Sequence, residues 1–520
     1  MAASDSSAER TDVLIVGGGS AGSVLAARLS EDPNRTVRLL EAGGVFPLDS
    51  IPDDLLDPAH VPGEPEHDWG FTMRGGVHSP EIIAPRGKAL GGSSSVNATV
   101  ASRMTPDDLR KWNEHGLEGW PAEEVFATYK ALENTTYGDP EIHGQSGPFP
   151  VRHQAYEDLT SSLKAFVDAG VAAGFKRVAD FNSDDRHGIG GNSVNVVDGK
   201  RQSAAIVYLT AAVRARPNLI IEGGVLVDRV KLEGGRATGV VDADGAIYSA
   251  SEVILCGGSY CSPAILLRSG IGPAADLEKL GIDLVADLPV GRRLTDQPFY
   301  YNGYALKADY QDERPATGAL LWTASSEARG DELDLHVTAT HLFPPQLSPT
   351  GGAITFGIAV VAPDSRGTLR LKSRDPREQP IIDGNFLYEE RDRRRILEAV
   401  KIGRELGKSA QMAPLLELEM FPGDSVTDDD ALLQAIESNL ASYGHPTGTA
   451  PMGGPDEASA VVDSFGAVKE VEGLRVIDAS IMPEEPTVAT NPTVLMIAEH
   501  MARRAYGVTT LRDGQVGSIA

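Results

Sequence analysis

The chain has little of three things: cysteine, positive charge and long apolar runs. Its two cysteines, Cys256 and Cys261, are too few for a disulfide framework in 520 residues, and no histidine close in sequence completes a metal site. The 47 basic residues against 74 acidic ones leave a net charge of −27, which argues against a nucleic-acid partner. No run approaches the ~20 apolar residues that span a bilayer, so we expect no stable membrane insertion. The first ten residues, MAASDSSAER, lack a secretory signal, and we expect a cytoplasmic location.

A length of 520 residues predicts two or more domains, and the first begins with a recognisable pattern. The apolar run at residues 13–16 predicts a buried strand, residues 23–30 predict a helix, and residues 36–40 predict a second strand. This β–α–β order is the context in which a dinucleotide-binding turn is expected.

Three glycines, Gly17, Gly19 and Gly22, lie between the first strand and the helix as G-x-G-x-x-G. They allow a tight turn, the close approach of a pyrophosphate and close packing of helix on strand. The free N–H groups of the helix N-terminus would face the phosphates. Glu41, at the end of the second strand, suits the hydroxyl groups of a ribose. The stretch therefore predicts a dinucleotide site.

Three later segments have a similar character. In PRGKALGGSSSVNATVASR (residues 85–103), small residues suit close backbone approach to a flat polar ligand. In EVILCGGSYCSPAILLRSGIGP (252–273) we expect a buried strand, a Gly–Gly turn and a helix that begins near Ser262–Pro263, because proline suits a first helical turn. Residues 474–505 predict a strand, a loop and a long helix from about Pro492. One nucleotide-binding domain built from discontinuous segments would explain all of them.

These segments, in this order, resemble the signatures of the glucose–methanol–choline (GMC) oxidoreductase family. PRGKALGGSSSVNA is similar to the first signature and GGSYCSPAILLRSGIGP to the second. SYGHPTGTAPMG, with LRVIDASIMP and TNPTVLMIAE, is similar to the C-terminal active-site block, and DSRGTLRLKSRDPREQPIID to the start of the C-terminal homology region. The resemblance covers about residues 13–505 and implies FAD-dependent oxidation of an alcohol.

The fold that the resemblance implies is α/β (α+β), with two domains. A Rossmann-like FAD-binding domain of the glutathione-reductase type would take residues 1–155, 200–295 and 455–520. A substrate-binding domain built on an antiparallel sheet would take residues 156–199 and 296–454. The alternating pattern of RGDELDLHVTATHLFPP, in the second domain, is typical of a strand with one apolar face.

The resemblance and the motifs together assign residues that would contact FAD. Val227 would belong to a strand whose backbone pairs with the adenine. Asp478 would belong to a turn beside the ribityl chain of FAD; the alternative is that Asp478 forms only an ordinary Asx turn. Val96 occupies the position where some family members attach FAD to a histidine, so we expect non-covalent FAD. The expected cofactor residues are Gly17, Gly19, Ser20, Ala21, Gly22, Glu41, Ala42, Gly91, Gly92, Ser93, Asn97, Val227, Asp478, Ala479, Asn491, Pro492 and Thr493.

Alcohol oxidation needs a group that takes the hydroxyl proton, and histidine suits this because its pKa is near 6.5. Of eleven histidines, His445 matches the catalytic histidine of the family, with His336 and His341 as less favoured candidates. The resemblance implies that His445 takes the proton while hydride passes to flavin N5. Asn491 matches its partner, which would hydrogen-bond the substrate oxygen, cap the last helix, or do both. Gln297 stands where the family commonly has histidine, with no consequence that the sequence predicts.

The substrate wall is expected to come from residues 300–306 and 316–326, which supply tyrosines and Leu320, Leu321 and Trp322. Such a wall suits an apolar or aromatic primary alcohol, or the face of a sugar. Three functions stay open: an alcohol oxidase that uses O₂, a dehydrogenase that passes electrons to a quinone or another carrier, and a hydroxynitrile lyase of the same fold. The oxidase is our working hypothesis.

Overall fold

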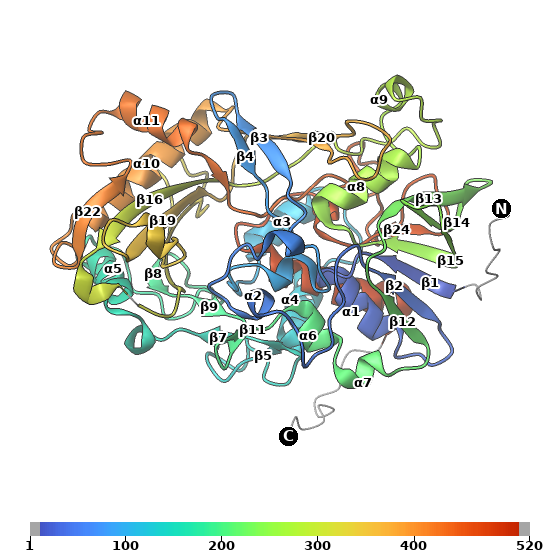
Figure 1. The fold of residues 1–520 in the computed structure, drawn as a ribbon, viewed down its shortest axis with the longest axis horizontal. Coiled ribbons are helices and arrows are strands. Elements are labelled where there is room, and N and C mark those ends of the chain that lie inside the picture. Colours follow the sequence, from blue (N-terminus) through green and yellow to red (C-terminus); the bar gives the residue numbers. More distant parts are fainter. Residues whose placement is uncertain (1–10, 312, 509–520) are drawn as a thin grey trace.

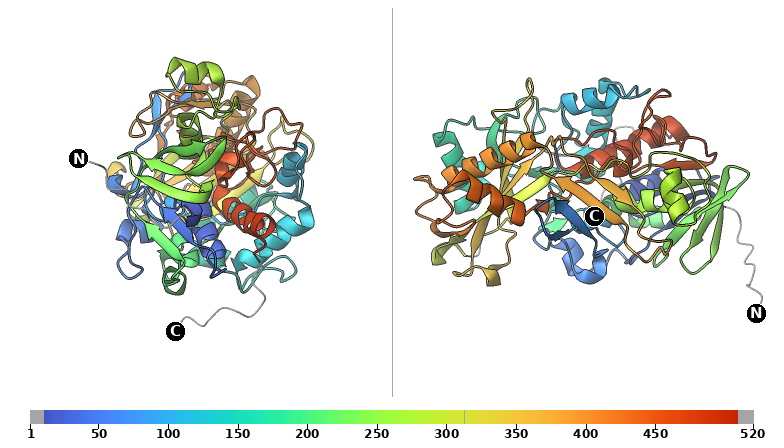
Figure 2. Two further views of the ribbon diagram at one scale, coloured as in Figure 1. Left: turned by 90° about the vertical axis from the view of Figure 1, so that its right-hand side faces the viewer. Right: turned by 90° about the horizontal axis from the view of Figure 1, so that it is seen from above.

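Two large sheets lie at opposite ends of the long axis of the computed structural model, which describes residues 11–311 and 313–508 (Figure 1). Residues 1–10 and 509–520, which the expected FAD-binding domain includes, lie outside the described residues. Seen from above, the strands coloured yellow to orange lie at one end and those coloured blue and green at the other (Figure 2).

The first sheet has parallel strands at its centre. Its order is β12-β2-β1-β15-β14-β13, with β24 pairing with β15. Strand β1 pairs in parallel with β2 and β15, and β15 with β24, so these strands end at one common edge. The strands are β1 (Thr11–Val16), β2 (Val37–Leu40), β12 (Leu219–Glu222), β13 (Val227–Glu233), β14 (Arg236–Asp242), β15 (Ile247–Leu255) and β24 (Leu474–Val476).

Apolar residues on both faces of β1 explain why this strand is central. Its last four residues are at most 4% exposed, as expected for a parallel strand covered on both sides. Helix α1 (Ser20–Leu29) packs against the C-terminal helix α12 (Thr490–Tyr506), and Arg28 pairs with Glu499 at 2.7 Å between them. The further helices of this half are α6 (Ala204–Tyr208), α7 (Ala211–Arg214), α8 (Gly258–Arg268) and α9 (Ala274–Lys279).

The second sheet is antiparallel, with the order β22-β16-β19-β18-β17-β8 and β23 pairing with β16. Helices α5 (Ser161–Ala172) and α10 (Glu390–Gly407) pack on it. The strands are β8 (Gly188–Gly191), β16 (Pro298–Leu306), β17 (Thr317–Thr323), β18 (Leu335–Thr340), β19 (Ala353–Val360), β22 (Leu416–Phe421) and β23 (Ala441–Ser442). The expected pairing of a Rossmann-like domain with an antiparallel substrate domain is confirmed.

A third sheet, of order β20-β21-β3-β4, joins segments that are far apart in the chain. The hairpin of β3 (Thr72–Gly76) and β4 (Glu81–Ile83) pairs with β21 (Ile381–Phe386), which in turn pairs with β20 (Thr368–Arg370). The hairpin belongs to the expected FAD-binding segments and β21 to the expected substrate-binding segments, so this sheet ties the two together.

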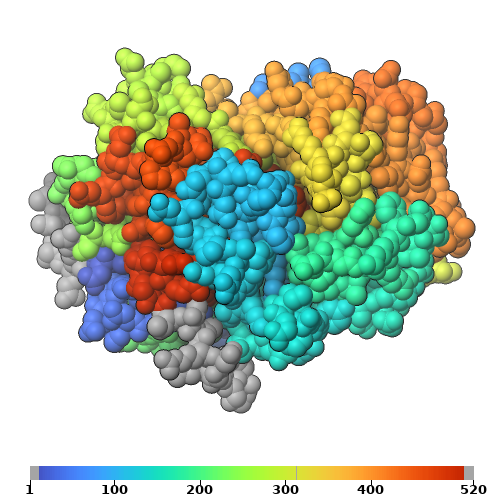
Figure 3. All heavy atoms as spheres, turned by 180° about the vertical axis from the view of Figure 1, so that it is seen from behind, coloured from blue at the N-terminus to red at the C-terminus, as the bar shows by residue number. Residues whose placement is uncertain are grey.

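Helices α3 (Pro106–Asn113) and α4 (Ala122–Leu132) bridge the two ends of the molecule on the rear face, where their light blue to cyan atoms lie between the red and the yellow-green parts (Figure 3). Helix α4 packs on α12, and Lys111 of α3 pairs with Glu332, just before β18. The other elements are α2 (Asp53–Leu56), α11 (Asp429–Ser438), β5 (Glu133–Asn134), β6 (Phe149–Pro150), β7 (Arg152–His153), β9 (Ser193–Val194), β10 (Val196–Val197), β11 (Lys200–Arg201) and the 3₁₀ helices η1 (Pro65–His67), η2 (Gly92–Ser95), η3 (Tyr156–Asp158), η4 (Ala308–Tyr310), η5 (Pro345–Leu347) and η6 (Ala479–Ile481).

Helix α8 differs from its prediction. It begins at Gly258 rather than near Ser262, so Pro263 lies inside the helix. Proline cannot donate to the carbonyl four residues earlier, which is that of Ser259. The Thr449 hydroxyl donates to this carbonyl at 2.8 Å instead. The helix therefore continues through the proline because a distant side chain replaces the missing hydrogen bond.

Candidate active site

A cavity of about 740 Å³ opens at the common edge where β1, β2, β15 and β24 end, and extends to the antiparallel sheet. We call it the central cavity. Most of the expected cofactor residues line it: Gly17, Gly19, Ser20, Ala21, Glu41, Ala42, Gly92, Ser93, Asn97, Val227, Asp478, Ala479 and Asn491. Ligands of open α/β sheets bind at such an edge.

The glycine turn has the geometry that its sequence predicts. Gly17 has a φ of +100°, and a Cβ there would lie 2.6 Å from the Cys256 carbonyl oxygen. A Cβ on Gly22 would lie 1.9 Å from the Gly17 carbonyl oxygen, so the third glycine serves close packing behind the cavity. Helix α1 begins at Ser20 without a capping side chain from the described residues. Its first N–H groups are therefore free for an anionic ligand.

Glu41 is buried where β2 ends. Its Oε2 accepts the Gly18 N–H and its Oε1 the Gly43 N–H, each at 2.8 Å. Burial raises the pKa of Glu41, although these N–H donors oppose the shift. Each carboxylate oxygen keeps a further lone pair, so the predicted contact with a ribose is compatible with these bonds.

A second glycine turn packs directly against the first, and the Gly91 N–H donates to the Gly18 carbonyl at 2.7 Å. Gly91 and Gly92 have φ values of +98° and +53°, and a Cβ on Gly92 would lie 2.8 Å from the Gly19 Cα. Only glycine allows the two turns to meet this closely. Nearby, Asn97 accepts the Thr99 N–H with its Oδ1, while its Nδ2 has no partner among the described residues.

Asp478 has a structural role that the motif left open. Its Oδ1 accepts the N–H and the hydroxyl of Ser480, and its Oδ2 accepts the Gly258 N–H and the Ser262 hydroxyl. These four donors use the ordinary acceptor capacity of a carboxylate. The side chain therefore joins the turn after β24 to the first residues of α8, as an Asx turn extended by two further bonds.

Four of the expected cofactor residues lie outside the lining of the cavity: Gly22, Gly91, Pro492 and Thr493. The two glycines serve the turns themselves. Thr493 is fully buried on the far side of α12, where its hydroxyl bonds the Tyr129 hydroxyl at 2.8 Å. Helical periodicity explains the difference, since residues adjacent in a helix point in different directions.

Asn491 is the second residue of α12, whose N-cap is Ala489, so the expectation that Asn491 caps the helix is wrong. Its Oδ1 accepts the Ser20 hydroxyl at 2.7 Å, which joins the first turns of α1 and α12. Its Nδ2 is buried and has no partner among the described residues. A buried amide donor without a partner, on a residue that lines the cavity, points to a ligand acceptor.

His445 reaches the cavity from the loop that follows β23. Its Nδ1 lies 2.8 Å from Gln297 Oε1, and Nε2 has no partner among the described residues. Burial, together with the charge of Arg86, lowers the pKa of His445 to about 3. The imidazole is therefore neutral at physiological pH, and one ring nitrogen is free toward the cavity.

Asp296, which precedes Gln297 in the chain, holds the segment that carries His445. Asp296 accepts the backbone N–H groups of Gln297 and His445, at 2.8 Å and 3.0 Å, and the Ser442 hydroxyl. Burial raises the pKa of Asp296. Gln297 was noted in the sequence only as a departure from a family motif, and the contacts of Asp296 and Gln297 with His445 were not foreseen.

The wall beside His445 is aromatic. Phe299 stacks on Tyr443 with ring centroids 4.6 Å apart, and the Tyr443 ring lies 4.6 Å from that of His445. Tyr301 packs edge-on against Phe299. Leu320, His336 and Thr338 add to the lining from the neighbouring strands.

The expectation that Leu321 and Trp322 line the pocket is wrong. Leu321 follows Leu320 on β17 and points to the other face of the sheet. Trp322 lies one layer back, edge-on against His336 at 5.0 Å, and its Nε1 donates to the Leu333 carbonyl.

The other two candidate histidines differ in position. His336 lines the cavity, and burial with the nearby His445 lowers its pKa to about 3. His341 lies outside the lining and bonds Thr160, Ser162 and the Ala353 carbonyl, so its role is structural.

Charge within the lining is uneven. Among the described residues that line the cavity, the acidic ones are Glu41, Asp478 and Glu378, and Glu378 pairs with Lys372 at 2.8 Å. None of the three is part of the wall around His445. Arg86 donates to the Gly444 carbonyl at 2.9 Å and forms no ion pair with the described residues. The end of the cavity near His445 is thus lined by the Arg86 guanidinium and, among the described residues, by no carboxylate.

The remaining expectations concern absent features. Within residues 11–311 and 313–508, no cluster of three potential metal ligands is found. None of the helices in that part of the chain is long and apolar enough to cross a bilayer. Cys256 and Cys261 line the cavity as free thiols, and burial raises the pKa of Cys261 to about 12.

The residues present fit a flavin dinucleotide. The N-terminus of α1 has no capping side chain and suits a diphosphate. The glycine turns are packed so closely that no side chain would fit there. The buried Asn491 Nδ2 has no acceptor among the described residues and could donate to the cofactor. The elongated lining joins this region to the aromatic wall at His445.

Comparison with known proteins decides the family. Models of GMC oxidoreductases match residues 11–299 and 363–498. The chain is a GMC oxidoreductase. This flavoprotein is 34% identical over 538 residues to an oxygen-dependent choline dehydrogenase of Brucella anthropi, with 96% of each chain covered. Its family acts on alcohol-type substrates.

Solved structures agree with this assignment. The GMC oxidoreductase superposes on pyridoxine 4-oxidase from Mesorbium loti with a TM-score of 0.86 and 32% identity, covering 96% of this chain and 99% of the other. An FAD-dependent oxidoreductase from Chaetomium thermophilum shares the fold, with a TM-score of 0.84 at 23% identity, covering 96% and 100%.

Proposed function

We propose that this GMC oxidoreductase oxidises neutral apolar or aromatic primary alcohols, with non-covalent FAD and with O₂ as the electron acceptor. One observation carries the proposal: His445, with a free Nε2, and Asn491 border the same cavity as the dinucleotide turn. Because FAD sites of this family have that turn at one end, the histidine would meet the substrate at the other.

The chain would hold FAD mainly through backbone. Gly17, Gly19 and the first turn of α1 would take the diphosphate, Glu41 the ribose, and the backbone near Val227 the adenine. Bound FAD supplies the hydride acceptor for the alcohol carbon. The Val96 side chain, which lines the cavity, offers no nucleophile for a covalent bond to the cofactor.

His445 would act as the proton acceptor. Its Nε2 faces the cavity without a competing partner among the described residues, and its neutral state leaves that lone pair available. A base with so low a pKa cannot remove the proton of an alcohol in advance. His445 would therefore accept the proton as the carbon loses hydride, when the hydroxyl becomes strongly acidic.

Asn491 would hold the substrate oxygen. Ser20 bonds its Oδ1, so the Nδ2 side is the one left to donate. A donor fixed in place stabilises the negative charge that develops on the oxygen during proton transfer. The proposed division of roles is a base in His445 and a positioning donor in Asn491.

The substrate class follows from the wall. Phe299, Tyr301, Tyr443 and Leu320 favour a flat apolar body. A quaternary ammonium alcohol would meet the Arg86 charge at an end of the cavity that no carboxylate of the described residues lines, so choline, the substrate in the name of the Brucella relative, is disfavoured here. A sugar, stacked on the same rings, is the second candidate.

We also propose the division into an FAD-binding domain (residues 1–155, 200–295 and 455–520) and a substrate-binding domain (156–199 and 296–454). The strands of each large sheet come from the matching segments, which supports the division. Three smaller pairings cross the boundary: β3 with β21, β7 with β9, and β10 with β11.

An alcohol panel tests the function. We expect benzyl-type alcohols to bleach the flavin anaerobically faster than choline or glucose, and to yield one H₂O₂ per aldehyde in air. Reduction of a quinone analogue without peroxide would favour the dehydrogenase. Cleavage of a cyanohydrin with no change in the flavin spectrum would favour the lyase and contradict the proposal.

A further inference from the structure

The side-chain amide of Gln297 makes three hydrogen bonds, and the partner atoms determine which end of the amide donates and which end accepts. Its Nε2 donates to the Val361 carbonyl at 3.0 Å and to the Pro486 carbonyl at 3.1 Å. Its Oε1 lies 2.8 Å from His445 Nδ1. The residue is fully buried at the start of β16, so water does not compete for these bonds.

The two carbonyls fix which way the amide points. A carbonyl oxygen only accepts, so the side of the amide that faces Val361 and Pro486 must be the NH₂ group. The oxygen then faces His445. An amide oxygen also only accepts, so Nδ1 of the imidazole must carry the proton of the contact. In the neutral ring this leaves Nε2 as the bare, accepting nitrogen.

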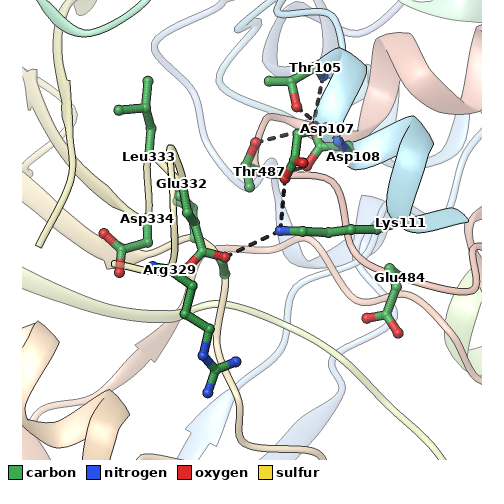
Figure 4. A network of polar contacts seen from close by, with 12 residues as sticks. Thr105, Asp107, Asp108, Lys111, Arg329, Glu332, Leu333, Asp334, Glu484 and Thr487 are labelled. Atoms are coloured by element: carbon green, nitrogen blue, oxygen red, sulfur yellow. Dashed lines mark hydrogen bonds and ion pairs between the residues drawn. The ribbon is translucent and has the colours of Figure 1, made fainter. Parts of the chain in front are cut away.

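The carbonyls are themselves held in place. Asp108, at the start of α3, accepts the N–H and the hydroxyl of Thr487, one residue after Pro486. Figure 4 shows this contact beside the bridge from Lys111 to Glu332, which ties α3 to the segment before β18. The Val361 N–H donates to the Asp334 carbonyl at 2.8 Å. The amide of Gln297 is thus anchored by two separate segments.

We propose that Gln297 is a positioning residue that keeps His445 in the Nδ1–H tautomer, with Nε2 as the proton acceptor for the alcohol. A neutral amide does this without adding charge, in contrast to the carboxylate partner of many catalytic histidines. The assignment rests on the proposed role of His445 as the base.

Among the described residues, no other group around the His445 ring fixes its tautomer. Asp296 bonds the backbone N–H of His445, not its ring. The Arg86 guanidinium bonds the Gly444 carbonyl and repels a proton on the imidazole without selecting a nitrogen. Tyr443 lies against the ring with an interplanar angle of 45°, and its hydroxyl contacts Thr338 and His336 rather than His445.

The tautomer can be read directly by ¹⁵N NMR of the holoenzyme labelled at its eleven histidines, with the His445→Ala spectrum used for assignment. We expect a protonated Nδ1 and a bare Nε2 for His445 in the unmodified protein at pH 7. A proton on Nε2 would overturn the proposal, whatever the variants do.

Variants then test whether Gln297 determines the tautomer of His445. Gln297→Met fills a similar volume without an acceptor, and we expect a mixture of tautomers, with a flavin reduction rate lower by on the order of 10–10³-fold and an unchanged KM. Gln297→Glu keeps an acceptor toward Nδ1, because its second oxygen faces two carbonyls and holds a proton. We expect it to restore the Nδ1–H tautomer and most of the rate.

Asn302→Leu is the matched control. Asn302 lies on β16, the strand that begins directly after Gln297, and donates to Glu419 and the Phe421 carbonyl, away from His445. It should lower the melting temperature as Gln297→Met does while leaving the His445 signals unchanged. A tautomer shift in this control, or a wild-type spectrum in Gln297→Met, would refute the proposal. If the tautomer is as expected but His445→Ala reduces flavin normally, the proposed function fails and the tautomer assignment survives.

Discussion

Replacing His445 with alanine should slow flavin reduction and leave the cofactor in place. The imidazole touches Gln297 and the Tyr443 ring, and its free Nε2 is the only part of it that we assign to the alcohol. Loss of a general base costs on the order of 10²–10⁴-fold in rate. This corresponds to about 2.7–5.4 kcal/mol of barrier, at about 1.36 kcal/mol per factor of ten.

The assay is anaerobic stopped-flow reduction of the bound flavin by a good aromatic alcohol. It isolates the step in which the alcohol is oxidised from the later reaction with O₂. The visible spectrum of the variant before mixing should be nearly that of the unmodified enzyme, because the ring does not hold the cofactor.

His336→Ala is the control, since His336 lines the same cavity and is neutral as well. It should alter KM more than the limiting rate. If His445→Ala reduces its flavin at the wild-type rate while His336→Ala is slow, the roles are reversed and the reasoning from the free Nε2 is wrong.

Four further predictions concern the charge near His445, the binding of FAD and the stability of the fold. Because only the neutral ring of His445 accepts a proton, flavin reduction should be constant from neutral pH downward and fall only as pH approaches about 3; a fall centred near pH 6.5 would contradict the lowered pKa. Arg86→Met removes the cation that helps to lower this pKa, so the acid limb should move to higher pH and discrimination against choline should weaken, as stopped-flow reduction with both alcohols would show. Glu41→Ala leaves the Gly18 and Gly43 N–H groups unpaired, and the free energy of FAD binding, measured by fluorescence titration, should weaken by about 1–3 kcal/mol, with turnover of the remaining holoenzyme unchanged. Arg201→Met should destabilise the protein by roughly 2–5 kcal/mol in denaturant titration, since the guanidinium is fully buried and donates to five backbone carbonyls; an unchanged midpoint would show that water replaces it.

The parts of the fold that local sequence determines were predictable. The strand expected at residues 13–16 is β1 (Thr11–Val16), and the glycines after it have the contacts that the fingerprint requires. Apolar periodicity and glycine spacing are local signals, and here the tertiary structure agrees with them.

The predictions about Pro263 and Asn491 were wrong because both positions depend on tertiary contacts. Pro263 lies inside α8 because Thr449, distant in the chain, donates to the carbonyl that the proline leaves free. Asn491 is the second residue of α12 rather than its cap, and its Oδ1 accepts from Ser20 of another helix. Such contacts join residues separated by nearly two hundred positions or more, and no local pattern contains them.

The candidate site was predictable in part. Family motifs pointed to His445 and Asn491, and both line the cavity. The contributions of Gln297 and Arg86 were not foreseen, because each depends on which carbonyl or ring the fold brings within reach. Leu321 was misplaced because a short apolar run does not reveal which face of a strand meets the ligand. Trp322 was misplaced because His336 of the neighbouring strand packs against it and lines the cavity in its place.

The parallel pairing of β24 with β15, and the meeting of Asn491 with Ser20, have a consequence for synthesis on the ribosome. Residues 474–491 complete both the sheet edge and the cavity, yet they are translated long after β1 and its glycine turn. The N-terminal turn therefore leaves the ribosome more than four hundred residues before its partner helix exists. Long-range pairing of this kind slows folding and leaves apolar edges unpaired in the meantime. A nascent chain that stops short of α12 has no finished cofactor site, so FAD binding reports that translation of this segment is complete.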